Sequence, residues 1–517
     1  MTAKTRYDVL SSNRSQYLSI AKQASALTIP YLVHEDDNAT GARKLVTPWQ
    51  SVGAKGVVTL AAKLMMSLLP PQTSFFKLQV DESKLGEYGP QIKSELDLAF
   101  AKVERTILEA IAASDDRVVV HQAMKHLVVS GNALIFMGKN GLKLFPLNRY
   151  VIDRDGNGNV IEIVTKESIN KKLIEELMPN LKKGEVSDYN DDDTSDCDVY
   201  THVTVKNNRV SWHQEVFDKV IPKSQSKSPL SITPWLPLRF NTVDGEGYGR
   251  GRVEEFMGDL KSLEALSQAL VEGSAAAAKV VFTVSPSAST KPATLAAAGN
   301  GAIVQGRPDD IGVVQVGKGA DFQTAYQAAG TLEKRLSEAF LILNVRQSER
   351  TTAEEVRMTQ MELEQQLGGL FSLLTVEFLV PYLDRKLSVL QRNKIIPPIP
   401  KDVVKPTIVA GINALGRGQD RESLTMFMQT IANTVGPEAM MNFINPDEVI
   451  KRLAAASGID VLNLVKSMQE IQGQQQQQMQ QQMAMQEQQN APAMAAVEQK
   501  QMQAEMQMAQ QQQQPPG

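Results

Sequence analysis

The sequence is poor in the residues that build disulfides and metal sites. Cys197 is the only cysteine among 517 residues, which excludes an intrachain disulfide and any zinc site built from several cysteines. The five histidines form no i, i+4 pair with a glutamate, the arrangement of a helical zinc site. A reducing compartment therefore fits the chain, and we expect no cofactor.

The chain also lacks an excess of charge of one sign and long apolar runs. Its 54 Lys and Arg residues face 58 Asp and Glu residues, so no global basic field collects nucleic acid, although local basic patches remain open. The apolar stretches 57–70 and 367–380 contain Lys63 and Glu377 and are shorter than the roughly 20 residues of a bilayer span. The amino terminus lacks the apolar core of a secretory signal. We therefore expect no membrane segment, and we expect the chain to stay where it is made.

Complete catalytic motifs are missing as well. The chain contains no Walker-type phosphate loop and no Gly-x-Ser-x-Gly nucleophile elbow. Residues 245–251 read GEGYGRG and could hold a phosphate ahead of a helix, but the spacing favours a flexible strand-to-helix junction. Asp153 to Gly158 reproduces half of a calcium loop, but Val164 stands where the closing glutamate is needed, which favours a hairpin turn. An enzyme that uses the acidic stretch 184–198 remains an alternative.

Hydrophobic periodicity predicts an α+β body from about residue 13 to 240. A buried helix is expected to begin at Thr47-Pro48 and to end at Pro70. The segments between 133 and 165 are β-rich and predict a meander, and strand patterning resumes at Val199 after the acidic stretch, which we expect to be a mobile loop. Helices and strands thus alternate in the first half of the chain.

The second half is predominantly helical. Beyond Gly245, one apolar stripe at spacings of three and four predicts an amphipathic helix; its members are Val253, Phe256, Leu260, Leu263, Ser267 and Leu270. A small α/β insertion, a helix over 321–343 and a long helix over 352–393 follow, and we expect the last to bend at Gly368-Gly369 and Pro381. The Gln- and Met-rich segment after residue 469 is of low complexity, either a disordered or fraying tail or an annular helical bundle of several copies.

Several segments, taken in order, resemble the portal protein, or head-to-tail connector, of short-tailed double-stranded DNA phages. The resemblance runs from about Tyr7 to the 460s and is carried by TPWQSVGAKG from Thr47, HLVVSGNALIFM from His126, DGEGYGRGRVEEFMGDLKSLEAL from Asp244, ADFQTA from Ala320, ERTTAEEVR from Glu349, LGGLFSLL from Leu367 and ALGRGQD from Ala414.

The resemblance implies an α+β, predominantly α-helical portal fold that assembles as a ring with a central channel. It implies a wing at 1–244, a first stem helix at 245–280, a clip at 281–320, a second stem helix at 321–344, a tunnel loop and long bent wing helix at 345–396, a helical crown at 397–468 and the tail at 469–517.

The function implied by the resemblance is structural. A homo-oligomeric ring, a dodecamer in family members, sits at one capsid vertex of the virion after assembly in the host cytoplasm. Double-stranded DNA is packaged through it by a docked terminase, whose large subunit hydrolyses ATP, and is later ejected through the short tail. Further partners are the tail adaptor and nozzle proteins, the major capsid and scaffolding proteins and, as an open option, internal core proteins. No catalysis and no membrane are expected; a metal-dependent nucleic-acid enzyme and a channel-less assembly scaffold are the alternatives.

Sliding DNA requires weak contact, because each neutralised phosphate adds affinity and therefore friction. We expect Arg346 and Arg350, in a polar loop between two helices, to be cationic tunnel residues, with Lys279 and Lys261 as weaker candidates. Ordinary intersubunit or surface ion pairing is the alternative interpretation for the two arginines.

Two protein interfaces are also expected. The stem stripe of Phe256, Leu260, Leu263 and Leu270 should pack against neighbouring subunits, because exposed amphipathic helices cannot bury their apolar faces in a monomer. In the clip, Arg307, Asp309 and Asp310 lie in a proline turn and are candidates for docking the motor or the tail adaptor, with a solvated turn as the alternative.

Overall fold

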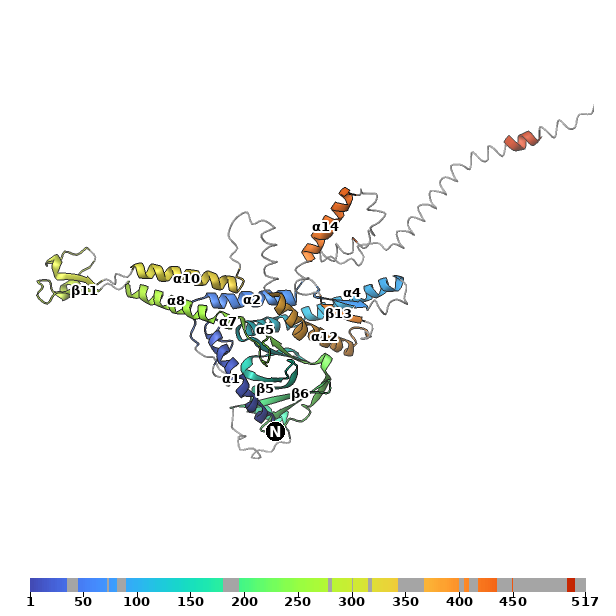
Figure 1. Cartoon of the computed structure of the whole chain (residues 1–517), viewed down its shortest axis with the longest axis horizontal. Coiled ribbons are helices and arrows are strands. Elements are labelled where there is room, and N and C mark those ends of the chain that lie inside the picture. The colour runs from blue at the N-terminus through green and yellow to red at the C-terminus, as the bar shows by residue number, and fades with distance from the viewer. Residues whose placement is uncertain are drawn as a thin grey trace, which may run out of the picture. The chain divides into compact units, whose positions relative to one another are not determined.

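A computed structural model describes most of the chain (Figure 1). The described residues are 1–34, 45–71, 74–80, 90–179, 195–277, 281–299, 301–314, 319–342, 367–398, 404–408, 417–434, 449 and 500–506. They fall into two compact units, Met1–Ala414 and Leu415–Gly517. In the second unit, α14 (Arg417–Thr434) is the longest described element. The first unit mixes helices and strands, which confirms the α+β prediction.

Two antiparallel sheets form the body of the first unit. The larger has β4 (Tyr150–Arg154), β5 (Val160–Asn170), β6 (Asp196–Lys206), β7 (Arg209–Val216) and β8 (Lys219–Val220) in order, with β9 (Ser226–Pro229) also paired to β7. The smaller has the order β10 (Trp235–Arg239), β2 (Asn132–Gly138), β3 (Gly141–Phe145). The predicted meander is therefore divided between two sheets. Pro146 and the short helical turn η1 (Leu147–Arg149) separate β3 from β4 and end the pairing.

Strand β6 begins earlier than the sequence indicated. Asp196 pairs with Asn170 and Asp198 with Ser168 in the β5–β6 ladder, so the end of the acidic stretch is strand rather than loop. The reason is local pairing: the Nζ atom of Lys166 lies 3.0 Å from an oxygen of Asp198, and Cys197 points into a small apolar cluster. Residues 180–194 of the stretch lie outside the described residues.

The half calcium loop is a hairpin turn, as predicted. Oδ1 of Asp155 accepts the backbone N–H groups of Asn157, at 2.9 Å, and Asn159, at 2.7 Å. The hydrogen bonds from Asn159 and Asn157 lower the pKa of the Asp155 carboxyl group. This carboxylate therefore closes the β4–β5 turn and is not left open for a cation.

Helix α1 (Ala3–Ala26) lies across the larger sheet (Figure 1). Its first half buries Ala3, Tyr7 and Leu10 against side chains of β4, β5 and β6. Two sheet carboxylates hold its amino-terminal end: the N–H of Ala3 donates to Glu215 at 2.6 Å, and the Arg6 guanidinium forms a bidentate pair with Glu162. Carboxylates near a helix amino terminus are favoured by the helix dipole as well as by these contacts.

Helices α2 (Val52–Leu68), α4 (Pro90–Ala112) and α5 (Asp116–Ser130) pack with the smaller sheet in the main apolar core. The prediction that the first of these begins at Thr47 is wrong. The backbone N–H groups of Trp49 and Gln50 donate to Glu264 instead of starting a helix, and Oε1 of Gln50 then accepts the N–H of Gly53 at 2.8 Å. A distant carboxylate therefore delays the start of the helix from Thr47 to Val52.

Residues 367–392 are helical, and by length and composition alone this helix could cross a membrane. It is instead a core helix: Leu374, Phe378 and Tyr382 are fully buried in the main core. A π turn, η5 (Thr375–Leu379), directly precedes α12 (Val380–Arg392). Pro381 explains the π turn, because proline cannot donate to the carbonyl of Glu377 and its ring would clash with it. The bend expected at Gly368-Gly369 stays a prediction, because the described part of this helix begins at Leu367.

The expectation of a helical region beginning at residue 397 needs a correction. Strand β13 (Val404–Ile408) pairs antiparallel with β1 (Phe76–Val80) of the body. Pro406 fits because a two-stranded sheet leaves an edge on which its missing N–H is not needed. Residues 404–408 therefore belong to the first unit.

The contacts of Glu162 predict a pH-dependent contribution to stability. Burial raises its pKa, but hydrogen bonds from Arg6 and His202 lower it further, so the net shift is downward. A carboxyl group with a lowered pKa stabilises the fold at pH values above its ordinary pKa of about 4.3. This stabilisation is lost as the pH falls through the folded-state pKa. We expect Glu162→Gln to lower the melting temperature at neutral pH, with the difference from wild type closing below about pH 4.

Thermal melts between neutral pH and about pH 3 test this prediction. Glu109→Gln is the matched control, since Glu109 is 65% exposed and pairs with Arg105 one turn away. A difference between wild type and Glu162→Gln that stays constant over this range would show that Glu162 acts by packing rather than by charge.

Candidate functional site: a helical hairpin and its junction

Two helices form an antiparallel hairpin, in which they lie side by side (Figure 1). They are α8 (Met257–Ala277), preceded by the short α7 (Arg252–Glu255), and α10 (Gly319–Ala339). At one end the rings of Phe256 and Phe340 are 6.1 Å apart, and at the other Phe322 packs onto Gly273. The two predicted stem helices are therefore confirmed as helices, with a break at Phe256 that the stripe did not indicate.

The half of the hairpin near the body is buried in the chain's own core. Leu260 and Leu263 are 0% and 3% exposed among residues of α2, α5 and α10. The premise that they need a neighbouring subunit is therefore wrong for these two leucines, because the same chain covers them. Phe256 packs against the same core, and Leu270 is half-buried.

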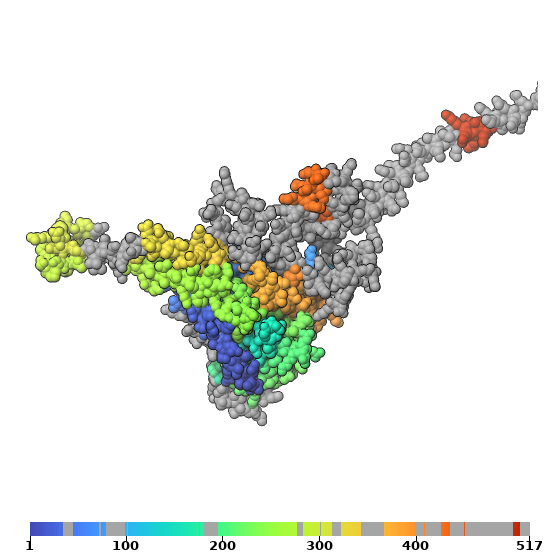
Figure 2. All heavy atoms as spheres, in the orientation of Figure 1, coloured from blue at the N-terminus to red at the C-terminus, as the bar shows by residue number. Residues whose placement is uncertain are grey.

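The other half of the hairpin carries apolar surface that the described residues leave uncovered. Val271 is 52% exposed and Tyr326 is 72% exposed. Since Phe322 faces Gly273, Tyr326 lies one turn further along, at about the level of Leu270. Figure 2 shows the atoms of α8 and α10 reaching the surface over the length of the hairpin. The predicted stripe ends at Leu270 and so left out Val271, and it runs along α7 and α8, whereas Tyr326 belongs to α10.

The glycine motif at 245–251 is a close crossing of two backbones. A Cβ atom on Gly249 would lie 2.6 Å from the carbonyl oxygen of Gly131, which itself has φ 72°. The side-chain amide of Asn132 closes the crossing, donating to the Gly249 carbonyl and accepting its N–H, each at 2.8 Å. Gly249 and Gly251 thus allow contact between backbones, whereas nothing lies within 4 Å of the Cβ positions of Gly245 and Gly247. The motif is a strand-to-helix junction, as expected, but its second half is tightly packed rather than flexible.

Ion pairs hold this junction together, and a cation–π contact ties it to α1. Arg250 bridges Glu246, at 2.6 Å, and Glu254, at 2.7 Å, and its guanidinium lies 4.8 Å from the ring centre of Tyr17 on α1. The hydrogen bonds that Arg250 donates, to Glu246 first and then to Glu254, raise its pKa against the effect of burial. The junction is thus held by side chains whose charges are already paired.

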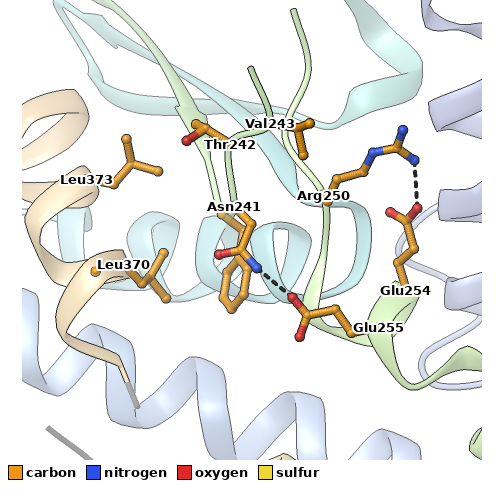
Figure 3. Close-up of a pocket in the computed structure, with 10 residues that line it drawn as sticks. Asn241, Thr242, Val243, Arg250, Glu254, Glu255, Leu370 and Leu373 are labelled. Carbon is orange, nitrogen blue, oxygen red and sulfur yellow. Dashed lines mark hydrogen bonds and ion pairs between the residues drawn. The ribbon is translucent and has the colours of Figure 1, made fainter. Parts of the chain in front are cut away.

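A pocket of 720 Å³ lies beside the junction (Figure 3). Asn241 donates to Glu255 at 2.6 Å on one wall, and Leu370 and Leu373 form the opposite wall. Its charged groups are paired with one another, and none is placed as a nucleophile beside a base. Within the described part of the chain, no group of three or more His, Cys, Asp or Glu residues is placed to hold a metal ion.

The carboxyl-terminal end of α10 is fixed in the main core. The ring of Phe340 packs so tightly on α2 that a Cβ atom on Gly56 would lie 2.6 Å from it. Ile342, just after the helix, and Leu367, where the described chain resumes, are 8% and 5% exposed in the same core. The predicted tunnel cations Arg346 and Arg350 fall between these two residues in the sequence and lie outside the described residues. Lys279 also lies outside the described residues. Lys261 is exposed and donates to Gln23 of α1 at 3.0 Å.

The predicted insertion contains a small antiparallel pair, β11 (Val281–Val284) with β12 (Ile311–Val314), and a short helix α9 (Pro292–Ala296). Asp310 turns inward: its Oδ2 accepts the N–H and the hydroxyl of Ser289, each at 3.0 Å. These hydrogen bonds, that from the Ser289 side chain first, lower the pKa of Asp310. Arg307 and Asp309 are exposed. Ile303, an apolar residue close to several glycines and alanines in the sequence, is exposed as well.

Sequence comparisons agree with one another. The family described as "Bacteriophage head to tail connecting protein" matches residues 1–463. The portal proteins of Escherichia phage T7 and Enterobacteria phage T3 are each 36% identical, over 91% of this chain and 89% of theirs. The portal protein of Enterobacteria phage SP6 is 30% identical over 82% of both chains.

The backbone crossing predicts a sharp dependence on Gly249. We expect Gly249→Ala to lower the free energy of unfolding by about 1–3 kcal/mol or more, because the added methyl group collides with backbone rather than with a movable side chain. Gly258→Ala is the control: nothing lies within 4 Å of its Cβ position, and we expect it to add about 0.5–1 kcal/mol of stability to α8. Denaturant unfolding measures both, and equal effects of the two alanines would contradict the crossing.

Asp310 is predicted to stabilise the insertion and not to act at its surface. We expect Asp310→Ala to speed hydrogen exchange and protease cleavage around Ser289, because it removes the acceptor of both hydrogen bonds. Asp309→Ala should leave both rates unchanged, since Asp309 is exposed. If Asp309→Ala loosens the insertion as much as Asp310→Ala does, the assignment of Asp310 is wrong.

Proposed function

The chain belongs to the family of bacteriophage head-to-tail connecting proteins and functions as a phage portal, and we propose that it does so as a closed homo-oligomeric ring with double-stranded DNA passing along its axis. The family match over residues 1–463 is the observation that carries this proposal. The connector reading is favoured over a nucleic-acid enzyme or a channel-less scaffold. Two of the carboxylates that an enzyme would have used, Asp196 and Asp198, lie in a paired strand.

Ring closure gives a reason for the uncovered half of the hairpin. We assign the stem interface to Leu270, Val271 and Tyr326, which a neighbouring subunit would cover. Phe256, Leu260 and Leu263, part of the expected interface, instead fasten the hairpin to its own body. Heterologous contacts of this kind, one face of a subunit on a different face of the next, close into rings when the rotation allows it.

The electrostatics suit the passage of DNA rather than its capture. Each chain carries a formal charge of −4, so a ring of many copies is acidic and repels the duplex on average. Against this background we assign Arg346 and Arg350 to the channel as the cations that keep the duplex centred, with Lys279 as a weaker candidate. Lys261 is the weakest, since Gln23 already accepts its hydrogen bond.

Docking of other proteins is assigned to the insertion at residues 281–320. Arg307 and Asp309 are exposed there, with Ile303 as an apolar contact, while Asp310 holds the turn that presents them. The proposed partners are the terminase large subunit during packaging and the tail adaptor and nozzle proteins afterwards. The wing would contact the major capsid, scaffolding and internal core proteins, at a vertex of the virion assembled in the host cytoplasm.

The assembly is tested by negative-stain electron microscopy with mass photometry on the same sample. We expect rings with a hole of about 20 Å or more, and a mass near that of a dodecamer. Val271→Asp with Tyr326→Asp should give folded subunits that do not close into rings, because charge would enter the proposed interface. Rings from this variant, or monomers and dimers from the wild type, would contradict the proposal.

The channel assignment predicts a specific effect of charge reversal. Arg346→Glu with Arg350→Glu should leave ring formation intact, impair packaging, and lower the slope of log DNA affinity against log salt by about 1 or more. Arg105→Glu is the control, since Arg105 is an exposed cation on α4 that pairs with its neighbour Glu109. If the reversed pair and the control package DNA equally well, the two arginines do not face the DNA.

A further inference from the structure

The register of the smaller sheet shows which backbone groups of β3 point away from it. Along an antiparallel strand, residues that bond one neighbour alternate with residues whose N–H and carbonyl groups face the other side. The N–H of Met137 on β2 donates to the carbonyl of Pro234, just before β10, at 2.8 Å. The alternate residues of β2 therefore face β3, where one of them pairs with Lys143. It follows that Leu142 and Leu144 direct their N–H and carbonyl groups outward, to the free edge of the sheet.

The opposite edge of this sheet and the edge of β1 are closed by side chains or by proline. On the outer edge of β10, the N–H of Arg239 donates to Glu377 at 2.8 Å, and Pro237, the preceding outward residue, has no N–H. On β1, the N–H of Leu78 donates to Glu104 at 2.6 Å. Such features keep a strand edge from pairing with another chain.

Three more strands of the body follow the same rule. The N–H of Ile152 on β4 donates to the hydroxyl group of Tyr248 at 3.0 Å. Pro229 of β9 and Pro406 of β13 stand at outward positions, where proline offers no N–H. Each of these strands therefore limits the row of donors on its outer edge.

Strand β3 has neither safeguard. Within the part of the chain that the structure describes, the N–H and carbonyl groups of Leu142 and Leu144 have no hydrogen-bond partner. Both leucine side chains are half-buried against the main core, and the side chain of Lys143 between them is 55% exposed. Two donors and two acceptors thus stand in a row on an accessible edge, which is what an added strand requires.

We propose that the β3 edge binds an extended segment of a different protein by strand addition. Side chains at neighbouring positions of adjacent strands share one face of the sheet. The residues of the segment beside Leu142 and Leu144 would therefore extend the apolar face that packs on α5, and the residue between them would lie beside Lys143. The edge thus fits a segment with the pattern apolar, carboxylate, apolar.

The charge of this edge favours the carboxylate at the middle position. Lys139 and Lys143 are the charged residues of the stretch from Asn132 to Phe145, and Lys139, in the turn between β2 and β3, is exposed. Lys143 pairs with Glu167 of β5, but an ammonium group has three donor hydrogens, so it can bind a second carboxylate as well.

A second copy of the chain fits the edge less well than a different protein. The strands described above close or interrupt their own edges, so they offer a neighbouring subunit no matching row of donors and acceptors. Pairing of β3 with β3 would relate two copies by a twofold axis, and such an isologous contact gives a dimer rather than a larger closed ring. This last comparison rests on the proposed function, whereas the open edge does not.

Peptide binding to the full-length protein tests the proposal. The probe is a fluorescein-labelled peptide with the sequence TVEVT, measured by fluorescence anisotropy, and TVKVT is its matched control. We expect saturable binding of TVEVT, and roughly threefold weaker binding of TVKVT because its lysine meets Lys143. Lys143→Ala should remove the difference between the two peptides.

Two substitutions at one position isolate the backbone contribution. Leu144→Pro removes the outward N–H, while the bonds to β2 come from Lys143 and Phe145 and remain. Leu144→Ala removes the leucine side chain but keeps the N–H. We expect the proline variant to bind TVEVT roughly fivefold more weakly than the alanine variant, because one hydrogen bond is lost. Thermal melts identify a variant that has lost its fold, and Leu142→Pro with Leu142→Ala then replaces the pair.

Amide exchange resolved to single residues reads the same edge independently. Without peptide, the N–H groups of Leu142 and Leu144 should exchange faster than those of Lys143 and Phe145, and TVEVT should slow them. Slow exchange of the two leucines before peptide is added would show that a second copy occupies the edge, which overturns the assignment to a different protein.

The proposal is also overturned if the wild type shows no saturable binding of TVEVT, or if the proline and alanine variants bind it equally. These measurements need neither a ring nor DNA. Failure of the chain to form rings would therefore reject the proposed function and leave the β3 edge to be decided by peptide binding alone.

Discussion

The approach of the Phe340 ring to the backbone of Gly56 is the contact on which the arrangement of this portal depends. No side chain larger than hydrogen fits at Gly56, so α10 can lie directly on α2. That contact sets the position of the hairpin, because α8 is held against α10 by the packing of Phe256 on Phe340 and by the ion pair between Asp259 and Arg335. It also brings Ile342 and Leu367, the two ends of the proposed channel segment, into one core.

Buried carboxylates that accept hydrogen bonds from other elements fix where those elements meet. Glu377 accepts from the backbone and the guanidinium of Arg239, joining the core helix to β10, and Asp116 accepts from Tyr382 and Lys386 to join α5 to α12. Removing one partner of such a pair leaves an uncompensated buried charge, so these pairs strongly favour one arrangement of the elements over others.

The hairpin divides its work along its length. Near the body, Leu260 and Leu263 stabilise the single chain, and further out Val271 and Tyr326 are exposed on the surface that we propose a neighbouring subunit covers. A chain built in this way can fold before it assembles, since the core does not depend on the neighbour. The proposed ring, in which each chain has a net charge of −4, would guide DNA without binding it tightly.

The sequence by itself determined the elements and the family. Periodicity located both hairpin helices and the hairpin turn at Asp155, and the ordered segments from Thr47 to Ala414 carried the resemblance that the comparisons then bore out. These are local or linear properties, which neighbouring residues fix without reference to distant ones. The channel cations Arg346 and Arg350 remain a prediction, because they lie outside the described residues.

Only the tertiary structure decided what each residue faces. A helix was expected at Thr47, but Glu264, more than two hundred positions away, takes the N–H groups that would have begun it. An apolar stripe looks the same whether its own chain or another covers it, so the sequence could not separate Leu260 from Val271. Likewise, the glycines of GEGYGRG suggested flexibility, but Gly131, which precedes the neighbouring strand β2, shows that Gly249 and Gly251 are needed for close packing. Long-range contact is the physical reason in each case, since it depends on residues that no local pattern contains.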